Sequence, residues 1–159
     1  MLINLKKELW QQFGASIDML NHAIAAWPDL YWYSEKRFFY MAYHTVVFLD
    51  YYLTLPPPAI FSSSLPFTFA EPEAIPPDAI DDLIPNEIYS KAELQNYLQR
   101  CRLKCQQFID GLTEEKLMAR WKEADGQMDY SAFEILLYNM RHVQHHAAQL
   151  NLLLRQGMN

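Results

Sequence analysis

The chain has 159 residues, of which 51% are hydrophobic and 20% charged, the composition of an ordinary globular protein. This length fits one hydrophobic core, so we expect a single domain over residues 1–159. The net charge of −6 argues against nucleic acid as a partner, because binding phosphates needs a basic face and the 13 Lys and Arg residues are scattered.

No membrane partner is expected, since the most apolar run, residues 45–55, contains Asp50 and then reaches Pro56. The first residues carry charges and amides where a signal peptide needs an apolar block, which favours a cytoplasmic location. Cys101 and Cys105 stand in a chain too long to be a disulfide scaffold. We expect both to be reduced and packed in the core.

Apolar residues at spacings of three and four predict an amphipathic first helix. Its stripe runs from Trp10 to Trp27, and Pro28 ends it. Ser34 is a candidate N-cap for a second helix, which continues without Gly or Pro over residues 36–55. This second helix is apolar on most sides, so we expect it to be deeply packed.

Two Ser-x-x-Glu capping boxes, at Ser90 and Ser131, predict the starts of a third and a fourth long helix. A glycine ends each of them, Gly111 the third and Gly157 the fourth. Residues 113–130 are expected to be a mixed connection with one short turn of helix.

Eight of the nine prolines lie in residues 56–85, which predicts a long connection without regular structure. Such a segment can run the length of a bundle and let the second and third helices lie parallel, whereas the short connection before the second helix makes the first two antiparallel neighbours. The expected fold class is therefore all-α: an up-down-down-up four-helix bundle with a long Pro-rich crossover between helices 2 and 3.

Three of the five histidines are expected to converge. His142 and His146 are four residues apart on one helix, so their rings rise from one face at a distance that suits a shared metal ion. His44 lies in the apolar second helix at the matching height of an antiparallel pair. Three neutral imidazoles could hold a divalent ion and leave coordination positions open. His22 and His145 point away from these faces and are expected at the surface.

Some neighbouring groups have two readings. An i, i+4 histidine pair also arises from packing alone. Asn139 and Gln149, one turn to either side of the pair, either orient a ring or are ordinary polar residues of a helix face. Four tyrosines of the second helix are expected to form core and pocket wall, with one hydroxyl able to reach a bound ligand: Tyr40, Tyr43, Tyr51 and Tyr52.

The last long helix, with MRHVQHHAAQLNLLLR at residues 140–155, resembles the last helix of DinB-like proteins. The segment FFYMAYHTVVFLDYYL at residues 38–53 supplies the other histidine of that family. The resemblance implies a four-helix bundle that holds one divalent metal through His44, His142 and His146. Zn or Ni is the expected ion by ligand type, with Fe or Mn as alternatives.

Two functions are open, and the resemblance bears on the first. Characterised relatives include thiol-dependent S-transferases and isomerases in which a metal activates a low-molecular-weight thiol. The first expectation is therefore a metal-dependent enzyme acting on a small molecule, of the S-transferase or hydrolase type. The alternative is a non-catalytic metal-binding or structural bundle that acts as a homodimer or through another partner. The sequence assigns no catalytic residue and no organic cofactor.

The Pro-rich segment itself leaves two hypotheses open. It carries Phe61, Phe67 and Phe69, apolar groups that a solvated linker does not need. It is either a lid over the metal pocket that helps to select the substrate, or a disordered crossover between two helices.

Overall fold

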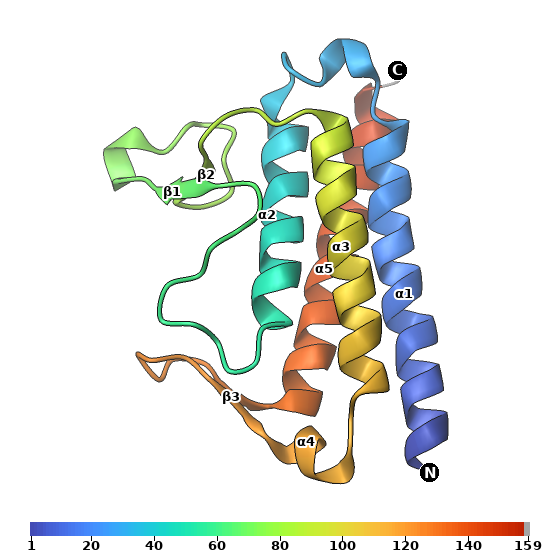
Figure 1. Ribbon diagram of the computed structural model, residues 1–159. Coiled ribbons are helices and arrows are strands. Elements are labelled where there is room, and N and C mark those ends of the chain that lie inside the picture. Colours follow the sequence, from blue (N-terminus) through green and yellow to red (C-terminus); the bar gives the residue numbers. More distant parts are fainter. Residues whose placement is uncertain (158–159) are drawn as a thin grey trace.

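Four long helices packed side by side dominate the computed structural model, which describes residues 1–157 (Figure 1). They are α1 (Leu2–Ala26), α2 (Lys36–Tyr52), α3 (Lys91–Asp110) and α5 (Ala132–Gly157). In Figure 1, α1 and α5 run upward while α2 and α3 run downward. The long helices thus follow the predicted up-down-down-up order.

The helix ends mostly follow the sequence signals. Trp27 is extended and ends α1, because the residue before a proline avoids the helical conformation. Ser90 forms the predicted capping box with Glu93 at the start of α3. The prediction for Ser34 is wrong: Glu35 is the N-cap residue of α2, and it makes no side-chain capping bond.

The packing of the helices corrects one prediction. α1 packs against α3 and α5, and α2 packs against the same two helices, so α1 and α2 lie diagonally and are not neighbours. The nine-residue connection that contains the 3-10 turn Asp29–Tyr31 crosses one end of the four long helices. Trp32 is buried there, and its indole N–H donates to the carbonyl of Tyr89 at 2.9 Å. This bond ties the crossing to the start of α3.

Two small antiparallel sheets correct the expectation of a purely helical chain. Within the Pro-rich segment, β1 (Phe67–Phe69) pairs with β2 (Leu83–Pro85), with the 3-10 turn Pro72–Ala74 between them. The prediction that this segment lacks regular structure is therefore wrong. After α3, the short helix α4 (Glu114–Met118) supplies the predicted turn, and β3 (Arg120–Lys122) pairs with β4 (Asp129–Ser131). The chain is mostly helical, with these hairpins packed at the side and at one end of the helices (Figure 1).

One tryptophan explains why the second hairpin is ordered. Along β3 the side chains alternate, so Trp121 is fully buried while Arg120 and Lys122 are exposed. The Trp121 indole N–H donates to the carbonyl of Thr54 at 2.9 Å. The hairpin is thereby fixed to the chain that leaves α2.

The hydrophobic core lies along the axis of the long helices and extends to Leu65 and Leu83 of the Pro-rich segment. Cys101 and Cys105 are free and buried in it, as predicted, and burial raises the pKa of both thiols. Across residues 1–157, no helix is long and apolar enough to cross a membrane.

A candidate metal centre between two helices

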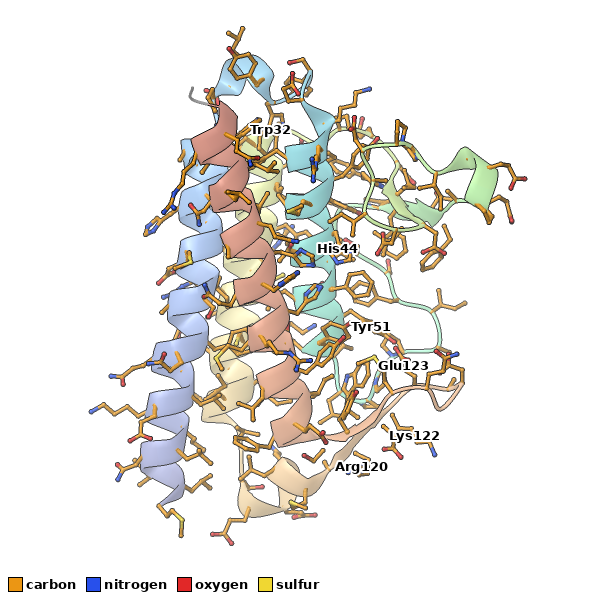
Figure 2. The ribbon with its side chains drawn as sticks, turned by 180° about the vertical axis from the view of Figure 1, so that it is seen from behind. Trp32, His44, Tyr51, Arg120, Lys122 and Glu123 are labelled. Carbon is orange, nitrogen blue, oxygen red and sulfur yellow. The ribbon has the colours of Figure 1, made fainter. Side chains whose placement is uncertain are left out.

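Three imidazole rings meet between α2 and α5. The Nε2 atom of His142 lies 3.1 Å from Nε2 of His44 and 3.1 Å from Nε2 of His146. The ligand atoms of all three residues lie within 4.8 Å of one another. Figure 2 shows His44 halfway along α2, on the side where this helix faces α5 and the Pro-rich segment. The expectation that these histidines converge at one height is confirmed.

The surroundings keep the rings of His142 and His146 neutral. His44 and His146 are each 8% exposed, and His142 is half-buried. Burial is the main reason why the pKa of His142 falls from 6.5 to about 3 and that of His146 to about 4, with the neighbouring histidines adding to the effect on each. Neutral imidazole is the form that binds a metal.

A carboxylate from the Pro-rich segment reaches the first ring. Asp81 Oδ2 lies 2.9 Å from His44 Nδ1, an ion-pair distance without the alignment of a hydrogen bond. The other oxygen, Oδ1, accepts a hydrogen bond from the backbone N–H of Leu83 at 3.1 Å, which orients the carboxylate. An acceptor beside Nδ1 favours a proton there and leaves Nε2 of His44 free to bind.

The side chain of Gln149 lies against Nδ1 of the His146 ring, as Asp81 does against that of His44. Its Oε1 atom lies 2.7 Å from His146 Nδ1, so the amide oxygen accepts the Nδ1–H and leaves Nε2 unprotonated. Of the two readings open for Gln149, the structure supports ring orientation. Asn139 differs, because its amide donates to the carbonyl of Leu49 at 3.0 Å and so joins α5 to α2.

The remaining histidines and tyrosines lie outside the cluster. His22 and His145 are exposed, as predicted, although the ring of His145 is 5.0 Å from that of His146 between centroids. Tyr43 donates its hydroxyl to the carbonyl of Leu65, and Tyr52 packs edge-on to His142 at 5.9 Å. Tyr52 is therefore part of the wall of the site, whereas Tyr43 ties α2 to the Pro-rich segment.

Aromatic rings shield one side of the histidines. The Phe48 ring lies 4.7 Å from that of His44 and 5.9 Å from that of His142. An apolar wall of this kind excludes water, and this strengthens electrostatic interactions between the histidines and a bound ion.

The donor set fits a divalent metal ion. When unprotonated, Nε2 of His142 and the two Nε2 atoms 3.1 Å from it would turn their lone pairs toward one another, and a shared cation relieves that repulsion. Within residues 1–157, the group of side chains with this geometry consists of His44, His142 and His146, without a cysteine or carboxylate as a fourth member. Asp81 does not supply that ligand, since it faces the Nδ1 side of His44.

Packed helices with three histidines converging between two of them define a helical protein with a candidate metal centre. The chain belongs to the DinB superfamily, whose family model matches residues 12–150. That family binds metal, so the cluster lies where family membership leads one to expect an ion-binding group. Neither a curated protein nor a solved structure gave a significant match to the chain.

Sequence reasoning did not find Asp81. Helical periodicity places residues that share a helix face, but it says nothing about which part of a 30-residue connection returns to that face. The phenylalanines of the Pro-rich segment were the available signal that it packs on the molecule, and they do not single out this carboxylate.

Proposed function

We propose that the protein is a metal-dependent enzyme that acts on a small molecule, with one divalent ion held by His44, His142 and His146. The observation that carries this proposal is a cluster of three imidazole donors to which no further His, Cys, Asp or Glu among residues 1–157 contributes. Catalytic metal sites keep such an open position, whereas structural sites are closed by four protein ligands. Zn or Ni is the ion that this ligand set favours.

The chain's own residues prepare the site. Gln149 accepts the Nδ1 proton of His146, and the Asp81 carboxylate lies beside Nδ1 of His44, so both rings are free to direct the Nε2 lone pair toward the ion. Phe48 and Tyr52 keep water from one side of the rings. A bound divalent ion supplies Lewis acidity, which favours the anionic form of a thiol or water that reaches it.

A thiol-dependent S-transferase is the reaction class we favour. In such a step the thiol loses its proton to solvent, its sulfur forms a bond to an electrophilic carbon, and the leaving group departs with the electron pair of the broken bond. A hydrolase, in which water replaces the thiol, uses the same site.

The alternative is a bundle in which the metal or the fold serves a partner, for example a second copy of the chain. The exposed leucines Leu137 and Leu152 on the outer side of α5 are the observation that favours it, because a dimer interface would cover such groups.

Metal analysis of protein purified without a metal-affinity tag tests the first part. We expect about one divalent ion per chain in the wild type and none in His44→Ala. A wild-type protein free of metal after growth in metal-replete medium would contradict the proposal.

Turnover tests the second part. The loaded protein is mixed with 1-chloro-2,4-dinitrobenzene and a series of low-molecular-weight thiols, and with a series of esters for the hydrolase. We expect the wild-type protein to consume at least one substrate, and we expect His142→Ala to lose this activity. If the wild-type protein carries its full metal content but reacts no faster than His142→Ala, the non-catalytic alternative is favoured.

A further inference from the structure

A cavity of about 410 Å³ lies one helical turn from the histidine cluster. It is open on one side and lined by α2, the Pro-rich segment and the β3–β4 hairpin, and Phe48 belongs to both its lining and the wall of the histidine site. Its size is in the range of small-molecule sites. In Figure 2, Tyr51 and Glu123 lie beyond His44 toward the C-terminal end of α2.

Aromatic rings form a continuous lining for this cavity. Successive ring centroids are separated by 6.3 Å, 5.3 Å, 6.4 Å and 5.3 Å along the series Phe48, Tyr51, Phe61, Phe67 and Phe69. Phe69 remains 64% exposed although it is held in β1. An ordered, exposed ring at the rim of a cavity is what an apolar ligand would cover.

Glu123 gives the cavity a charge. Its Oε1 atom accepts a hydrogen bond from the Tyr51 hydroxyl at 2.9 Å, which directs the carboxylate toward the aromatic lining. No ion pair joins Glu123 to a basic side chain among residues 1–157, and the neighbouring Arg120 is engaged by Asp129 at 2.8 Å. The lining of the cavity includes no lysine, arginine or histidine.

We propose that this cavity binds an organic cation, an ammonium group carried on an apolar body. Faces of phenylalanine and tyrosine rings attract a cation, and a carboxylate at the edge neutralises its charge. The inference rests on the proposed function in one respect, since it assigns this cation as the substrate class of the same site. The shared Phe48 would place the bound molecule beside the histidine cluster.

Binding is measured with metal-free protein, so that failure of the metal proposal does not affect the result. The probes are 2-phenylethylammonium, the neutral 2-phenylethanol and the anionic 3-phenylpropanoate, each titrated while amide chemical shifts are followed by NMR. We expect shift changes around Phe48, Ile60 and Phe67, and an affinity for the cation at least about fivefold above that for the alcohol. The anion should bind most weakly.

Three variants separate the contributions. Glu123→Gln keeps an acceptor for Tyr51 and should remove the preference for the cation, whereas Glu8→Gln, the same charge change at an exposed position of α1, should leave it intact. Ala59→Trp introduces a bulky ring at an exposed position of the lining and should lower the affinity of the protein for all three probes. Equal affinities for cation and alcohol, equal effects of both glutamate variants, or shift changes away from the cavity would overturn the proposal.

Discussion

Asp81 Oδ2 lies 2.9 Å from His44 Nδ1, while Oδ1 of the same carboxylate accepts the backbone N–H of Leu83 at 3.1 Å. A single side chain therefore joins the start of β2 to a histidine on α2. The Pro-rich segment is an ordered part of the site's surroundings, which agrees with the lid hypothesis more closely than with a disordered crossover. Its role in selecting a substrate remains a proposal.

Asp81→Asn is expected to weaken metal binding by about 10- to 100-fold, because the carboxylate lies against Nδ1 of His44 and orients its ring. Competition titration with a chromogenic zinc chelator measures the affinity. Asp82→Asn is the matched control, because Asp82 is the next residue and is exposed, and its substitution changes the net charge by the same amount. An equal affinity in both variants would show that the contact with His44 has no effect on the ion.

Histidine substitutions should divide into two groups. Removing His44, His142 or His146 by an alanine substitution is expected to abolish metal binding, because two imidazoles remain where three converge. His22→Ala and His145→Ala remove exposed rings and should retain one ion per chain. Metal content after dialysis against trace metal distinguishes the groups, and uniform loss across all five variants would disprove the assignment.

The long helices and the histidine cluster were predictable because both depend on helical periodicity. His142 and His146 share a face of one helix, and counting residues from the helix ends put His44 at the same height, where its Nε2 lies 3.1 Å from that of His142. The diagonal placement of α1 and α2 was not predictable from the length of their connection. It depends on how Trp32 packs against the chain before α3.

The hairpins were missed for two different reasons. The β3–β4 turn does carry a signal, since Asp125 precedes Gly126, whose φ of 74° is the left-handed conformation that favours glycine. Strands of three residues are too short for their alternation to stand out in the sequence, so the turn alone does not predict a hairpin. β1 and β2 are joined by a long loop, and their pairing depends on packing against α2.

The Pro-rich segment is held by a buried chain of hydrogen bonds. Ser63 Oγ donates to the Tyr97 hydroxyl at 3.1 Å, and Tyr97 donates to Asp50 Oδ2 at 2.6 Å. Tyr97→Phe removes the acceptor of the Ser63 hydroxyl and the donor to Asp50 Oδ2, so we expect the free energy of unfolding to fall by about 1–2 kcal/mol. Amide exchange should also accelerate at residues 63–65, where the backbone N–H of Leu65 donates to Ser63.

Chemical denaturation and hydrogen-exchange mass spectrometry measure these two effects. Tyr31→Phe serves as the control, because Tyr31 is 42% exposed and removing its hydroxyl should change neither quantity. Unchanged exchange at residues 63–65 in Tyr97→Phe would mean that other contacts fix the segment to α2.

The stability of the metal-free protein should depend on pH through its buried histidines. In the unfolded chain a histidine takes up a proton near its ordinary pKa of 6.5, whereas in the folded protein burial lowers the pKa of His142 to about 3 and that of His146 to about 4. Below pH 6.5 the unfolded state therefore binds more protons than the folded state, so stability falls as the pH drops from about 6.5 toward 4. The free energy of unfolding should decrease by at least about 1 kcal/mol between pH 7 and pH 5.

Urea denaturation of chelator-treated protein measures this decrease, and His142→Gln should show a smaller one because one of the two groups no longer titrates. An identical decrease in wild type and variant would assign the pH dependence to other groups.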